Sequence, residues 1–202
     1  MGRSNVLSCQ VYGKVDWVNL DEREVGMFLR ISERETTRCV LRGPEVERML
    51  ANSLLQKGMM ATAHGALSAR CMKRNDDGSW MAEVLCTASR IAAEPAREGR
   101  LRGSIYANVK GVVLVWDANT LQLKTFLNPG ENGCTEKTTV SLHMKPWVDG
   151  MSTDGQERFK AMMRPGREFT ASAIVEVSCY RTRDGEQVPL LLLLPTDFRL
   201  QG

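Results

Sequence analysis

Apolar and polar residues alternate over many short stretches of this chain, as half-buried β-strands require. One stretch covers residues 6–18, and a similar one covers residues 108–117 near the middle of the chain. Each contains a glycine, Gly13 or Gly111, and a glycine within a strand often marks a bulge or a sharp bend. The same alternation predicts further strands at residues 26–32, 37–41, 59–72 and 80–91 in the first half, and at 121–127, 138–145, 168–180 and 187–194 in the second.

One short helical pattern interrupts the strands of each half. In the first half, Pro44 suits the first turn of a helix, and Gly58 ends the apolar pattern. In the second half, residues 155–163 show a shorter pattern that ends before Gly166. A hairpin follows each helix, with the turn dipeptides Asp77-Gly78 and Asp184-Gly185 at the tips.

These features recur as an internal repeat of domain size. Gly58 and Gly166 are 108 positions apart (166 minus 58), and Gly78 and Gly185 are 107 apart (185 minus 78). Between the two copies, the segment 94–103 is polar and contains both proline and glycine, as linkers do. We therefore predict an N-terminal domain at residues 1–95, a linker at 96–104 and a C-terminal domain at 105–202.

The composition is that of an ordinary folded chain and restricts the function only weakly. Of the 202 residues, 43% are hydrophobic and 25% are charged, which excludes a long disordered, collagen-like or coiled-coil protein. The formal net charge of +3 is too small to identify a partner from bulk charge. Any interaction with a nucleic acid must therefore depend on the local placement of basic residues.

The motifs GKVDW at residues 13–17 and GVVLVW at residues 111–116 lie in the first strand of each copy. Strand, strand, strand, short helix, strand, strand is the order expected of the OB-fold, a five-stranded Greek-key barrel. In this order of elements, over nearly the whole chain, the sequence resembles single-stranded DNA-binding proteins of the OB-fold class with two OB folds in tandem. The predicted fold class is all-β with short helices, arranged as two tandem OB-fold-like five-stranded Greek-key barrels.

The resemblance implies a function, a partner and an assembly. Proteins of this class bind single-stranded DNA without catalysis and with little sequence preference, during replication, recombination or DNA transfer. Resemblance to the two-barrel members implies a homodimer, with an RPA-like monomer as the alternative. Bacterial members usually end in a flexible acidic tail, whereas this sequence ends in TDFRLQG, so we do not expect recruitment of partners through such a tail.

Strand phase predicts which side chains face a ligand, because neighbouring residues of a strand point to opposite faces. Several outward positions place an aromatic ring beside a cation, and single strands bind to such surfaces through base stacking and phosphate contacts. Tyr180, at the tip of the second hairpin, is a further aromatic residue beside cations of this kind. We predict that the nucleic-acid-binding residues are Tyr12, Lys14, Phe28, Arg30, Arg38, Arg42, Lys73, Arg74 and Trp80 in the first half, and Lys124, Phe126, Lys145, Trp147, Arg181 and Arg183 in the second.

Other residues have simpler structural explanations. Trp17 and Trp116 lie near valines of the inward phase and are expected to fill the barrels. The six cysteines are widely spaced without a CxxC pair, so we expect mostly reduced, structural thiols and no metal site. Tyr12 and Phe28 have an alternative role beneath a dimer partner, because exposed aromatic residues mark protein contacts as well as ligand sites.

Catalysis finds no support in the sequence. His64 and His143 have no identifiable partner, and the chain has no GxSxG, HExxH, GxxxxGK[ST] or GxGxxG motif, so we expect neither enzyme activity nor a cofactor. The N-terminal segment has no apolar run typical of a signal peptide. The longest apolar run, residues 190–194, is far shorter than a membrane span. These features predict a cytoplasmic protein without membrane contact.

Alternatives to DNA binding stay open at this point. An OB barrel can serve as a protein–protein interaction module that never contacts nucleic acid. RNA is an alternative ligand, because none of the predicted residues reads the 2′-hydroxyl group. The second half, residues 103–202, has equal numbers of acidic and basic residues, which is compatible with a purely structural or dimerising role.

Overall fold

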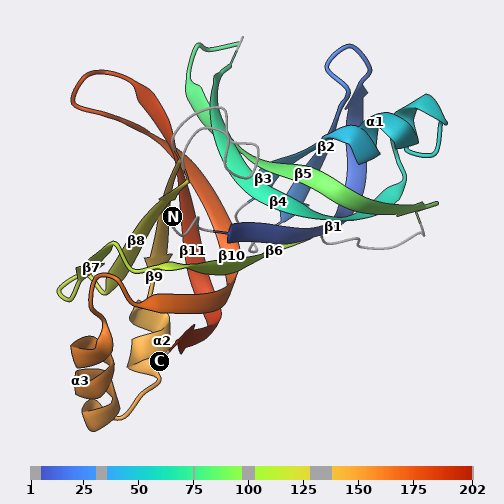
Figure 1. Ribbon diagram of the computed structural model, residues 1–202. Coiled ribbons are helices and arrows are strands. Elements are labelled where there is room, and N and C mark those ends of the chain that lie inside the picture. The colour runs from blue at the N-terminus through green and yellow to red at the C-terminus, as the bar shows by residue number, and fades with distance from the viewer. Residues whose placement is uncertain (1–5, 31–35, 75, 97–102, 128–137, 202) are drawn as a thin grey trace.

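Strands dominate the chain, and each half repeats one order of elements (Figure 1). The computed structural model describes residues 6–30, 36–74, 76–96, 103–127 and 138–201. The first half contains β1 (Val6–Asn19), β2 (Glu24–Arg30), β3 (Thr36–Arg42), α1 (Pro44–Ala51), β4 (Met60–Lys73) and β5 (Trp80–Glu94). The second half contains β6 (Ser104–Val112), β7 (Val115–Asp117), β8 (Gln122–Leu127), β9 (Thr138–His143), α2 (Lys145–Asp149), α3 (Thr153–Met162), β10 (Glu168–Arg181) and β11 (Gln187–Leu200).

The strands of each half pair in the order of an OB-fold. In the first half the sheet runs β1–β2–β3–β5–β4 and returns to β1, because β1 pairs with both β2 and β4. In the second half the order is β6–β10–β11–β9–β8. Strand β7, which continues from β6 after a short break, pairs with β8 and completes the circuit. This order is that of a five-stranded Greek-key barrel and confirms the predicted fold class.

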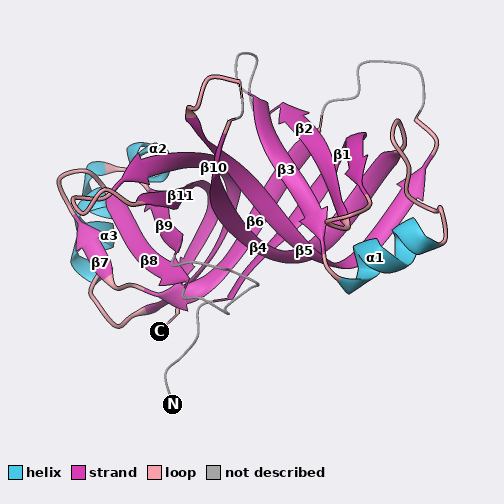
Figure 2. Cartoon of the chain, turned by 90° about the horizontal axis from the view of Figure 1, so that it is seen from above, coloured by secondary structure: helices cyan, strands magenta, loops and turns pink. Residues whose placement is uncertain are grey.

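A continuous sheet joins the two halves. Strand β1 pairs antiparallel with β6 over residues 6–12, and Cys9 lies opposite Ala107. All the strands thereby belong to one sheet, with α1 at one end of the molecule and α2 and α3 at the other (Figure 1 and Figure 2). The domain limits given above stay a prediction, because most of the predicted linker lies outside the described residues.

The internal repeat is visible in the strand register. The β4–β5 hairpin has a bulge between His64 and Gly65, and the β10–β11 hairpin has one between Ser172 and Ala173. The two bulges are 108 positions apart (172 minus 64), which is the offset found in the sequence between the two glycines that follow the helices. Equivalent positions of the two halves can therefore be compared directly.

A disulfide links Cys71 of β4 to Cys179 of β10, and these residues are also 108 positions apart. The expectation of reduced thiols is therefore wrong for this pair. Their equivalent places in the repeat are the signal that could have identified them from the sequence. Three further cysteines, Cys9, Cys39 and Cys86, are free and buried. A hydrogen bond to Cys86 together with burial raises the pKa of Cys9, and burial raises the pKa of Cys39, so these thiols are structural.

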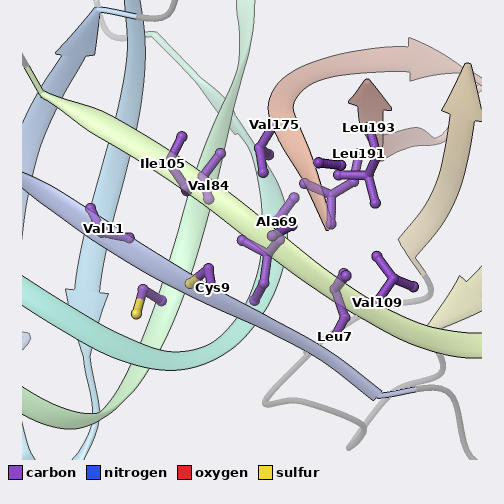
Figure 3. Close-up of a cluster of buried hydrophobic side chains, with 14 of the residues drawn as sticks. Leu7, Cys9, Val11, Ala69, Val84, Ile105, Val109, Val175, Leu191 and Leu193 are labelled. Carbon is purple, nitrogen blue, oxygen red and sulfur yellow. The ribbon is translucent and has the colours of Figure 1, made fainter. Parts of the chain in front are cut away.

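Buried apolar side chains form one cluster that extends across both halves. Figure 3 shows Leu7 and Val11 of β1 together with Val109 of β6 and with residues of β4, β5, β10 and β11. Trp116 packs against this cluster and contacts Phe159 edge-on, with ring centroids 6.0 Å apart, as predicted for a core residue. The two halves are therefore packed together as well as hydrogen-bonded.

The strands predicted at residues 108–117 and 138–145 differ from the observed ones. The first is interrupted, because β6 ends at Val112 and β7 begins at Val115. The strand predicted at residues 138–145 ends at His143, and α2 begins at Lys145. Pro146 explains the change, because proline has no backbone N–H for a strand ladder but is tolerated in the first turn of a helix.

Within the described residues, no helix has the length and apolar character needed to span a membrane.

Candidate nucleic-acid interface

The outward face of the first three strands carries part of the predicted row of aromatic and basic residues. Phe28 of β2 is 54% exposed and lies opposite Arg38 of β3. Lys14 of β1 is exposed, and Tyr12, which has the same phase in β1, is half-buried. Phe28 and Lys14 are thus accessible to a ligand from solvent.

Trp17 lies on this outward face and not inside the barrel. Its indole occupies the space above Gly26, where a Cβ atom would overlap the ring. The Arg38 guanidinium is 5.0 Å from the centre of the indole ring, within the range of a cation–π contact. A β-bulge between Val15 and Trp17 changes the phase of the strand at this point. The prediction that Trp17 fills the barrel is therefore wrong, and the glycine opposite it in β2 was the available signal.

Arg38 belongs to an ionic network with Glu24, Arg70 and Glu83. Its Nε lies 2.6 Å from one Glu83 carboxylate oxygen, and Nε of Arg70 donates to the other at 2.9 Å. Arg70 also donates to both oxygens of Glu24, at 3.0 and 2.8 Å. Burial opposes the charge of Arg70, but hydrogen bonds to Glu24 and Glu83 outweigh it and raise the pKa of Arg70. The charge of Arg38 is thus neutralised within the fold, which weakens the prediction that it contacts phosphate.

A large open groove lies at the second half. Its volume is about 1110 Å³, above the roughly 300–1,000 Å³ of pockets for small molecules. Trp80, Phe126 and Tyr180 line it together with Arg181 and polar residues of β9 and the β10–β11 hairpin. The size and the three aromatic rings are suited to an extended ligand with several flat groups.

Each aromatic residue reaches the groove from a different strand. Phe126 of β8 lies opposite Thr139 of β9. Tyr180, which is 39% exposed, lies near the end of β10, with its hydroxyl 3.1 Å from the Thr139 hydroxyl. Trp80, which is 48% exposed, begins β5 and comes from the first half. The groove is therefore composite, with its walls supplied by both halves of the chain.

The repeat allows the surroundings of Phe126 to be compared with those of its equivalent in the first half. Phe126 is the equivalent of Phe28: each is on the second long strand of its half and pairs with the third, at Thr139 and Arg38 respectively. In the first half Arg38 forms an ion pair with Glu83 of β5, whereas Thr139 lies opposite Leu190 of β11. A neutral pair thus takes the place of the ion pair next to Phe126.

Basic side chains lie at and near the groove. Arg181 lines it and donates from Nε to the carbonyl oxygen of Gly185 at 3.3 Å, which holds the guanidinium against the hairpin. Glu186 also lines the groove, so its charge is mixed. The basic residues predicted on β8 and in the two hairpins are all exposed: Lys73, Arg74, Lys124, Arg181 and Arg183.

Lys145 and Trp147 are placed elsewhere, because they lie in α2 and the strand phase does not apply there. Lys145 forms an ion pair with Asp149 at 2.7 Å, and Trp147 is half-buried against the core cluster. Arg42 is half-buried, and the side chain of Arg30 lies outside what the structure describes.

Within the described residues, no three His, Cys, Asp or Glu side chains come together as a metal ion requires.

Comparison with known proteins identifies the fold. No protein-family model and no curated protein matches the sequence. A deletion mutant of the single-stranded DNA binding protein from Thermus aquaticus aligns over 98% of this chain and 96% of its own, with a TM-score of 0.50 and 13% identity. The wild-type Thermus aquaticus protein aligns over 99% of this chain and 95% of its own, with a TM-score of 0.46 and 13% identity. The alignment with the deletion mutant, together with the strand order, shows that the chain has an OB fold.

Proposed function

We propose that this protein binds single-stranded DNA without catalysis, by stacking bases on aromatic side chains and by contacting phosphates with basic side chains. The groove lined by Trp80, Phe126, Tyr180 and Arg181 carries the proposal. Aromatic rings stack with any base and contribute about 1–3 kcal/mol each, so little sequence preference is expected. The OB fold supports the proposal, since the Thermus aquaticus protein with a similar fold is a single-stranded DNA binding protein.

The first half adds a smaller contact area in this proposal. Phe28 and Lys14 are exposed on the outward face of β2 and β1 and offer one ring and one cation. Lys73 and Arg74 extend the basic surface at the tip of the β4–β5 hairpin, next to Trp80 in the ladder. A strand that leaves the groove past Trp80 would meet these cations first.

The biological setting forms the second part of the proposal. We infer a homodimer that holds single strands during replication, recombination or DNA transfer, with the two halves as tandem OB domains. Light scattering of the purified protein measures its molar mass, and a mass of two chains is expected.

Titration with oligo(dT) at several salt concentrations tests the proposal. We expect binding that weakens as salt rises, with a log–log slope of about −0.7 for each phosphate neutralised. Failure to bind, or binding that salt does not change, would contradict it. A parallel titration with RNA of equal length identifies an RNA-binding protein if the RNA binds more tightly.

A further inference from the structure

The disulfide joins the two hairpins that supply the groove. Cys71 lies in β4, whose hairpin partner β5 begins with Trp80. Cys179 lies in β10 and directly precedes Tyr180. The Cα atoms of the two cysteines are 5.8 Å apart. One covalent bond thus connects the hairpin that carries Trp80 to the hairpin that carries Tyr180.

The bond lies beyond the sheet that the halves share. Strand β4 pairs with β1 as far as Ala66, and β10 pairs with β6 as far as Ile174. Cys71 and Cys179 each lie five positions further along (71 minus 66, and 179 minus 174). From there each hairpin continues as a two-stranded ribbon, and such ribbons have little stability of their own. A covalent link between Cys71 and Cys179 therefore restricts how far the two hairpins can separate.

We propose that Cys71 and Cys179 are positioning residues of the binding groove, because their disulfide holds Trp80 next to Phe126 and Tyr180. This inference rests on the proposed function. Among the three aromatic residues of the groove, Trp80 alone comes from the first half, so its position depends on the relation between the two hairpins. Binding of a single strand is then sensitive to thiol reductants.

Reduction breaks the link by ordinary thiol–disulfide exchange. Both cysteines are partly exposed, so a small dithiol reaches them. Dithiothreitol attacks one sulfur to form a mixed disulfide and then closes to its cyclic disulfide. The S–S bond of the protein is replaced by two S–H groups, and two electrons and two protons pass from the dithiol to the protein.

The test compares the affinity for oligo(dT) of the oxidised chain, the chain reduced with dithiothreitol, and the double variant Cys71→Ser with Cys179→Ser. Peptide mapping without reductant first establishes the Cys71–Cys179 link, and circular dichroism sets a temperature at which all forms are folded. We expect reduction and the double substitution each to weaken binding about fivefold or more, as the loss of one stacking contact would. Reoxidation should restore the affinity of the reduced chain.

The variant Trp80→Ala distinguishes a positioning role of the disulfide from a general effect of reduction on the fold. In this variant the oxidised and reduced chains should bind within about twofold of each other, because the ring held by the disulfide is gone. In the matched variant Phe126→Ala, reduction should still weaken binding. Absence of the link, equal affinity of oxidised and reduced wild type, or an undiminished effect of reduction in Trp80→Ala overturns the inference. If the oxidised wild type fails to bind at all, the proposed function itself is overturned.

Discussion

Replacement of Glu83 by alanine should destabilise the fold by about 3–5 kcal/mol, the usual cost of removing one partner from a buried ion pair. The Glu83 side chain is fully buried and contacts both Arg38 and Arg70. Without it, two guanidinium groups that are only 24% and 26% exposed lose their common anion. Denaturant-induced unfolding, followed by circular dichroism, measures the change in the free energy of unfolding.

Glu47→Ala is the matched control for this variant. It also removes a carboxylate from an ion pair, with Arg23 at 2.7 Å, but both side chains are substantially exposed. Pairs of this kind contribute about 0–1 kcal/mol, so the control should unfold almost as the wild type does. Equal stability of the two variants would show that the Glu83 network does not hold the barrel together.

Replacement of Trp80 or Phe126 by alanine should weaken binding of oligo(dT) about 5- to 140-fold, because each lost stacking contact costs about 1–3 kcal/mol. Both side chains line the groove, and Trp80 is 48% exposed, so its removal should leave the core intact. Fluorescence anisotropy of a labelled oligonucleotide measures the affinity, and unfolding curves of the same samples verify that the variants are folded.

Tyr106→Ala provides the control for ring removal. Tyr106 is 50% exposed on β6, opposite Gln10, and is not among the residues that line the groove. Its loss should leave affinity unchanged. If Tyr106→Ala lowered the affinity for oligo(dT) as much as Trp80→Ala does, the oligonucleotide would bind on another face of the sheet.

Most elements of the fold could be predicted because their signals are local. Alternation predicted the strands, and Asp77-Gly78 and Asp184-Gly185 predicted the hairpin turns. The pairing of β1 with β6 could not be predicted, since alternation reports which face is buried and not which strand lies alongside. For the same reason, the sequence did not predict that one core cluster joins the two halves.

The candidate site was predictable only in part. Strand phase and hairpin position identified Phe126, Trp80 and Arg181, which the structure brings to one groove. The phase argument failed at Trp17, because a bulge shifts every residue after it to the other face. The role of Arg38 depends on Glu83, which lies on a strand far away in the sequence, so no local pattern indicates it.

Ultraviolet cross-linking of oligo(dT) to the oxidised protein, followed by mass spectrometry of the cross-linked peptides, tests most directly where a single strand lies. The account predicts adducts on the peptides that contain Trp80, Phe126 and Tyr180. Adducts confined to other peptides, or none at concentrations that saturate binding, would contradict it.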